Sequence, residues 1–257
     1  MSAERFTPGG YRFIPGVFQY SAGVAAEPGY AIERVTFSHP VPLIEGFARA
    51  AEMLAARGRP LTALCAVELR SPAPLSDEGF KGFNEGYVKI LAQWGIYDAQ
   101  SAINPVARSN VCPELDPPAE PSVYAFSFTV SAPEAGPSFV IAGSGEAREA
   151  GSGATYRQRT VRFGETSPAA LREKAAFVMG EMERRLGMLG VDWHATSATQ
   201  VYCVHDIRPF LGELIVGRGA ARQGVTWHLC RPPVAGLEFE MDCRGVGIEH
   251  RAFAAHR

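Results

Sequence analysis

The sequence contains one pattern of elements twice, and this repeat constrains the fold more than any other feature. Residues 17–23 (VFQYSAG) begin the first copy, and residues 139–145 (FVIAGSG) begin the second. Each half is expected to run strand, strand, helix, strand, helix, strand, strand. Helices set apart from mainly antiparallel strands are typical of an α+β fold. We therefore expect two tandem α+β domains, at residues 1–132 and 138–257, each a mainly antiparallel sheet with two helices on one face.

Hydrophobic periodicity and capping signals predict the helices. Apolar residues at helical spacing predict helices that begin at Pro42-Leu43 and end before Gly58, and that span residues 76–94 and 168–189. Ser76 and Ser167 are candidate N-caps. A short, glycine-interrupted helix is expected after Pro209. The predicted strands lie within 11–37 and at 61–69, 109–112, 123–130, 138–147, 154–163, 199–207, 225–229 and 237–243, with a glycine-rich turn at 143–153.

Composition and charge exclude several classes of protein. The chain has 257 residues and a formal net charge of −2, which gives no electrostatic reason to expect nucleic acid or an anionic membrane as a partner. No apolar run approaches the roughly 20 residues that span a bilayer. The N-terminus shows no apolar signal segment, so a cytoplasmic location is expected.

The cysteines do not indicate a disulfide framework or a metal site. There are five of them, an odd number, widely spaced and without a CxxC motif. We therefore expect no bound metal.

Several segments resemble the YjgF (Rid, reactive intermediate deaminase) superfamily, whose relatives include the chorismatases. Residues 20–23 (YSAG) and 142–145 (AGSG) look like its glycine turn, and residues 80–87 (FKGFNEGY) resemble its "F…vN..Y" helix. Residues 104–111 (NPVARSNV) look like its "P-x-A-R-S-x-V" strand, and residues 237–242 (LEFEMD) resemble its closing acidic strand. The resemblance implies tandem Rid-like domains that associate, most often as a trimer, with pockets at the interfaces between domains.

The resemblance also implies roles for particular residues. The family arginine, which holds a substrate carboxylate, corresponds to Arg108, and Arg222 is its candidate in the second half. The family glutamate, which places the attacking water, corresponds to Glu240, with Asp242 as the alternate register. Both acids share one face of a strand, so one can raise the pKa of the other, which suits acid–base work. The alternative for Arg108 is a structural ion pair, and the alternative for the acids is an ordinary solvent-facing strand. Further candidate substrate contacts are Tyr20, Asn110 and Cys112.

Three functions remain open on these grounds. The first is a cofactor-free hydrolytic deaminase of a small carboxylate-bearing enamine or imine, similar to 2-aminoacrylate or 2-aminomuconate. The second is a chorismatase-like hydrolase of an enol ether. The third is a small-molecule-binding or scaffold protein, because the first half lacks a carboxylate where the glutamate would fall.

Overall fold

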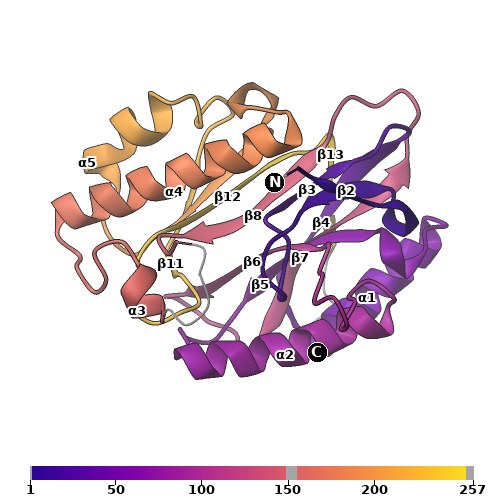
Figure 1. Ribbon diagram of the computed structural model, residues 1–257, viewed down its shortest axis with the longest axis horizontal. Coiled ribbons are helices and arrows are strands. Elements are labelled where there is room, and N and C mark those ends of the chain that lie inside the picture. Colours follow the sequence, from indigo (N-terminus) through magenta and orange to yellow (C-terminus); the bar gives the residue numbers. More distant parts are fainter. Residues whose placement is uncertain (1, 149–154, 253–257) are drawn as a thin grey trace.

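Two β-sheets lie face to face, with helices on the outer face of each (Figure 1). The structure is a computed structural model that describes residues 2–148 and 155–252. The six-stranded sheet has the order β11-β6-β5-β7-β4-β13, and the seven-stranded sheet has the order β1-β2-β3-β8-β12-β9-β10. Mixed α+β architecture is thereby confirmed.

The strands have the following bounds. The six-stranded sheet contains β4 (Tyr30–Pro42), β5 (Leu64–Arg70), β6 (Ala107–Pro113), β7 (Ser122–Ser131), β11 (Cys230–Arg231) and β13 (Ile248–Ala252). The seven-stranded sheet contains β1 (Glu4–Phe6), β2 (Tyr11–Ile14), β3 (Gly23–Ala26), β8 (Phe139–Gly145), β9 (Ala198–Tyr202), β10 (Thr226–His228) and β12 (Glu240–Gly245). Most neighbouring strands are antiparallel, but β5 with β6, β9 with β10 and β4 with β13 are parallel.

The two halves of the chain exchange strands. The N-terminal strand β3 pairs with β8, so β1–β3 extend the sheet built from the second half. In return, β13 pairs with β4 and β11 pairs with β6. The residues between the two expected domains, 133–137, follow β7 and precede β8, which belong to different sheets. However, each sheet contains strands from both halves, and this exchange brings residues of the two halves together.

Each outer face carries its own helices and its own apolar core. The helices α1 (Leu43–Ala56) and α2 (Asp77–Gln93) cover the six-stranded sheet, and α4 (Pro168–Leu189) covers the other (Figure 1). Beside α4 lie α5 (Arg208–Phe210) and the π-helical η4 (Leu211–Val216). A third apolar cluster lies between the sheets and consists of Tyr11, Phe13, Val24, Ile32, Cys65, Ala66, Ala107, Val140, Ala142 and Val246. The short helical turns are η1 (Thr7–Gly9), η2 (Leu61–Ala63) and η3 (Trp193–Ala195).

The three long helices agree with the sequence prediction, and one predicted strand does not. Ser76 and Ser167 each accept a hydrogen bond from the backbone three residues on, as N-caps do. The strand expected at 154–163 is wrong, because the described part of that range forms the helix α3 (Tyr156–Arg159). Thr155 and Gln158 form a capping box there, which favours a helical start over an extended chain. Residues 149–154 of the expected glycine-rich turn lie outside the described residues.

Candidate active site

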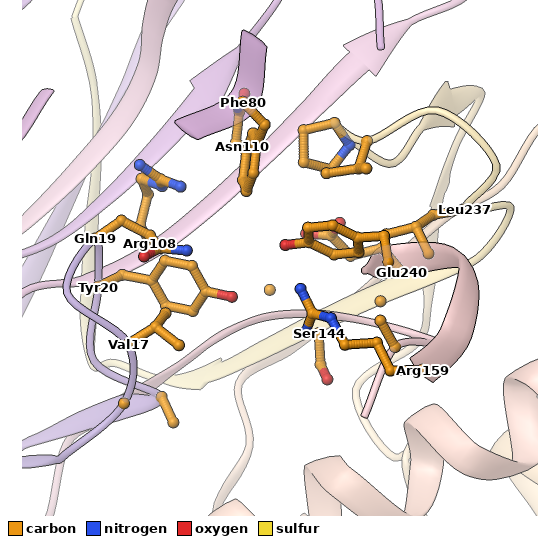
Figure 2. A pocket seen from close by; sticks show the side chains of 18 of the residues that line it. Val17, Gln19, Tyr20, Phe80, Arg108, Asn110, Ser144, Arg159, Leu237 and Glu240 are labelled. Atoms are coloured by element: carbon orange, nitrogen blue, oxygen red, sulfur yellow. The ribbon is translucent and has the colours of Figure 1, made fainter. Parts of the chain in front are cut away.

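A pocket opens where β6 of one sheet approaches β8 and β12 of the other (Figure 2). Its walls come from residues before β3, from β6, from the N-terminal part of α2, from β8 and β12, from α3 and from the loop before β12. Both halves of the chain therefore supply side chains to one cavity, as the strand exchange requires.

The two copies of the glycine motif meet at this pocket. The backbone N–H of Ala142 donates to the carbonyl of Ala22 at 3.1 Å, which joins the second copy to the first. Ser21 donates its backbone N–H to Val106 at 2.9 Å and its hydroxyl to Pro105 at 3.1 Å. These bonds hold the segment that contains Tyr20 against the start of β6, where Arg108 follows.

Arg108 is a buried cation surrounded by aromatic rings. Only 3% of it is exposed, and its guanidinium carbon lies 4.8 Å from the ring centre of Tyr87 and 5.2 Å from that of Tyr20. Phe80 and Phe83 complete this surround at 5.8 and 5.7 Å. Such rings stabilise a cation without neutralising it. Burial lowers the pKa of Arg108, and nearby tyrosines and Glu240 partly oppose that shift.

The guanidinium of Arg108 has hydrogen-bonding capacity to spare. Within residues 2–148 and 155–252, its buried Nε and Nη1 have no hydrogen-bond partner. Leaving such donors unpaired in a protein interior is costly. A buried guanidinium with unpaired donors has the capacity to bind an anionic ligand.

Glu240 lies in the same pocket on the strand β12 (Figure 2). It is 5% exposed, so it does not belong to a solvent-facing strand surface. Burial raises the pKa of Glu240 well above its usual range, and the negative charges of Asp242 and Glu146 raise it further. Arg108 and Arg185 act in the opposite direction. The net shift favours the protonated carboxylic acid, a form that can donate a proton to a ligand.

Asp242 is held between the sheets and does not line this pocket. It accepts hydrogen bonds from Ser109 Oγ at 2.5 Å, Gln200 Nε2 at 2.7 Å and the Tyr202 hydroxyl at 2.9 Å. Burial and the charge of Glu68 raise the pKa of Asp242, while the bonds from Ser109 and Gln200 lower it. The negative charge of Asp242 is nevertheless one of the causes that raise the pKa of Glu240.

The other predicted substrate contacts divide into two groups. Tyr20 and Asn110 line the pocket, and Asn110 accepts a bond from Ser71 Oγ at 2.9 Å. The Nδ2 of Asn110 has no partner among the described residues. Cys112 and Arg222 do not line the pocket: Cys112 is buried where β6 pairs with β11, and Arg222 is exposed in a turn after η4. Burial raises the pKa of Cys112 to about 12, so its thiol stays protonated.

Sequence reasoning missed five polar residues of the pocket among those described: Gln19, Ser144, Tyr156, Arg159 and Arg185. Arg185 reaches from α4 and donates to the carbonyls of Ala142 and Gly143 at 3.1 and 3.4 Å. Arg159 belongs to α3, the helix predicted as a strand. A Thr-x-x-Gln capping signal at 155–158 was available in the sequence for that helix, whereas no local signal marked Gln19 or Arg185.

The described residues contain neither a cluster of metal-ligating side chains nor a helix suited to cross a membrane. No group of three or more His, Cys, Asp or Glu side chains that could hold a metal ion occurs in residues 2–148 and 155–252. No helix in this part of the chain has both the length and the apolar character to cross a membrane.

Comparison with known proteins identifies the family. Residues 3–250 match the family model described as "2-aminomuconate deaminase CnbZ". The chain belongs to this family. A 2-amino-5-chloromuconate deaminase from Comamonas testosteroni is 53% identical over 243 residues, which cover 94% of this chain and 95% of that protein.

A solved structure shares the fold at low sequence identity. The crystal structure of a chorismatase at 1.08 Å resolution matches with a TM-score of 0.52 and 13% identity, over 90% of this chain and 79% of that one. The similarity concerns the fold alone. The expected Rid-like tandem domains and trimer stay predictions.

Proposed function

We propose that this protein is a hydrolytic deaminase of 2-aminomuconate or of a closely related amino-dienoic acid. The observation that carries the proposal is that Arg108 and Glu240 line the same pocket. Arg108 is a cation with unused hydrogen-bond donors, and Glu240 is a carboxyl group with a raised pKa. Family membership and the 2-amino-5-chloromuconate deaminase relative support the choice of substrate.

Arg108 binds and orients the substrate. Its free Nε and a terminal nitrogen match the two oxygens of a carboxylate, and the aromatic surround prevents the guanidinium from turning away. The amide Nδ2 of Asn110 and the Oε1 of Gln19 lack partners among the described residues, so they offer a further donor and acceptor in the pocket. Together these groups fix the position of the C–N bond relative to Glu240.

Glu240 moves the protons of the reaction. In its acid form it protonates the enamine carbon, which produces an iminium with a C=N bond. The resulting carboxylate takes a proton from water as the water oxygen bonds to the C=N carbon. Glu240 then returns that proton to nitrogen, the C–N bond breaks, ammonia leaves, and the remaining hydroxyl proton passes to Glu240 as the C=O bond forms. The sum is substrate plus water giving a 2-oxo acid plus ammonia, with Glu240 restored and no cofactor consumed.

Ammonia release tests the proposal. Purified protein is mixed with freshly generated 2-aminomuconate, and 2-aminoacrylate and chorismate serve as comparison substrates. We expect ammonia from 2-aminomuconate above the spontaneous rate, and loss of that release in Arg108→Ala with the thermal unfolding temperature retained. Pyruvate from chorismate without ammonia from 2-aminomuconate would favour the enol-ether hydrolase instead. No turnover of any of the three would favour a binding protein.

A further inference from the structure

The pocket carries more positive charge than one carboxylate requires. Among the described residues, three arginines line it, namely Arg108, Arg159 and Arg185, against one acidic side chain, Glu240. Burial and neighbouring acids favour the neutral form of that acid. Arg185 donates to two backbone carbonyls of β8 and so supports the wall. Arg159 remains as a second cation without a role in the proposed reaction.

Arg159 lies across the pocket from Arg108 (Figure 2). Its guanidinium carbon lies 3.8 Å from the ring centre of Tyr156, and its Nη1 donates to the carbonyl of Arg148 at 3.0 Å. The buried Nε of Arg159 has no hydrogen-bond partner among the described residues. Arg159 therefore shares with Arg108 the combination of an aromatic support and an unused donor.

The short helix that carries Arg159 is held by α2 on one side and by the segment after β8 on the other. The Tyr156 backbone N–H donates to Asp77 at the start of α2 at 3.2 Å, and the Tyr156 ring meets Phe80 of α2 edge-on at 6.2 Å. On the other side, the Arg148 backbone N–H donates to the carbonyl of Arg159 at 3.0 Å, next to the end of β8. The position of the second cation relative to the first is thus set by the fold.

We propose that Arg159 holds a second carboxylate, so that the pocket is specific for dicarboxylates in which a short planar chain separates the two acid groups. The identity of the substrate rests on the proposed function, whereas the binding of a dicarboxylate by Arg108 and Arg159 does not. Arg108 and Arg159 each engage one end, and Arg159 acts as a specificity residue that takes no part in proton transfer. A monocarboxylate such as 2-aminoacrylate leaves Arg159 unpaired, which disfavours it as a substrate.

A matched pair of unreactive ligands tests this directly. Muconate and sorbate share a six-carbon diene skeleton, but muconate has two carboxylates and sorbate has one. Their binding to the full-length protein is measured by calorimetry for wild type, Arg159→Ala, Arg159→Lys and Arg157→Ala. Arg157 is the control, because it lies on the same helix, carries the same charge and does not line the pocket.

The expected result is selective. Arg159→Ala weakens muconate binding roughly tenfold to a hundredfold, the range for a lost charge-assisted hydrogen bond, and leaves sorbate binding within about twofold. Arg159→Lys recovers part of the muconate affinity, and Arg157→Ala changes neither ligand. Equal losses for both ligands, no loss for either, or an equal effect of Arg157→Ala would each overturn the proposal.

The two proposals fail separately. Absence of ammonia release from 2-aminomuconate by wild-type protein would reject the deaminase, yet a selective loss of muconate binding in Arg159→Ala would still support a dicarboxylate pocket. Conversely, ammonia release with Arg159→Ala binding muconate as wild type does would keep the deaminase and reject the role of Arg159.

Discussion

Oε1 of Glu240 lies directly over the Cα of Gly143, so close that a Cβ at position 143 would overlap it. The two residues lie on the adjacent strands β12 and β8, where Glu240 pairs with Gly145 and its side chain reaches the position of Gly143. Position 143 therefore requires glycine, because the carboxyl group of Glu240 occupies the space that a Cβ would take, and a larger residue would displace the Glu240 side chain.

This contact predicts that Gly143→Ala inactivates the protein without unfolding it. Displacing a proton donor from the reacting atoms removes its contribution, which is typically about 10²- to 10⁴-fold in rate. Ammonia release and the thermal unfolding temperature are measured together. Gly145→Ala is the matched control on the same strand, because the nearest neighbour of its added Cβ is the flexible Leu237 side chain, at 3.2 Å. Full activity of Gly143→Ala would contradict the role of Glu240.

Replacing the acid itself separates chemistry from binding. Glu240→Gln keeps the shape and removes the transferable proton, so kcat is expected to fall by about 10²- to 10⁴-fold while muconate binding persists. Steady-state kinetics and calorimetry on the same preparation check this. Loss of muconate affinity as large as the loss of kcat would mean that Glu240 binds the ligand instead of transferring protons.

Asp242 is expected to set the pH range of activity through its charge on Glu240. The negative charge of Asp242 is one of the causes of the raised pKa of Glu240. In Asp242→Asn that contribution is gone, so the pKa of Glu240 falls, and the alkaline limb of the rate profile should move to lower pH. The thermal unfolding temperature is recorded beside the pH–rate profile, since the hydroxyls of Ser109 and Tyr202 both donate to Asp242. An unmoved limb would show that Asp242 does not tune the acid.

Stability should also depend on pH through Glu240. Its folded-state pKa lies above the value of an unfolded glutamate, about 4.3, so between these two values the native state holds a proton that the unfolded state has lost. Stability from this group is present below the unfolded pKa and is lost as pH rises toward the folded pKa. The glutamine of Glu240→Gln does not titrate. The difference between the free energy of unfolding of this variant and that of wild type should therefore increase, in favour of the variant, by up to about 1.4 kcal/mol for each pH unit of rise in that window. Urea unfolding at several pH values measures the gain, with the exposed Glu134→Gln as control; a constant offset would contradict the linkage.

Local signals were sufficient for the long helices. Ser76 and Ser167 cap α2 and α4, and Gly190 ends α4 in the left-handed conformation with φ 75°. Each of these effects involves residues within one turn of each other, so the sequence displays them. The helix α3 had the same kind of signal, but the surrounding glycines favoured a hairpin and the prediction there was wrong.

The site was predictable only in part, because its walls depend on long-range pairing. The resemblance of single segments pointed to Arg108, Tyr20 and Glu240, which all line the pocket. No local pattern shows that β3 pairs with β8 across the chain, since β-strand pairing is set by packing at large sequence separation. Arg159 was missed because α3 was predicted as a strand, and Arg185 because no local pattern shows that α4 packs against β8.

A buried ion pair between Lys174 and Glu146 supports the segment that leads into β12, the strand of Glu240. Lys174 of α4 donates to Glu146 Oε1 at 3.0 Å, and both side chains are fully buried. Glu146 also accepts the backbone N–H of Glu238 at 2.6 Å and of Phe239 at 3.1 Å, which fixes the chain immediately before Glu240. Burial raises the pKa of Glu146 and the charge of Lys174 opposes the shift, so the carboxylate depends on its partner.

Removing Lys174 alone should therefore cost both stability and activity. Lys174→Met leaves Glu146 buried without its cation, and the free energy of unfolding is expected to fall by about 3–5 kcal/mol, with a lower kcat as the segment before Glu240 loosens. The double variant Lys174→Met/Glu146→Gln should recover part of the stability, because it removes the unpaired buried charge. The recovery is partial because the Glu238 and Phe239 N–H groups donate to different oxygens of Glu146, and a glutamine amide has only one oxygen to accept them. Arg162→Ala, which breaks an exposed pair with Glu165, is the control and should change stability by less than about 1 kcal/mol. If the double variant is no more stable than Lys174→Met, packing of the lysine stem, and not its charge, holds the strand in place.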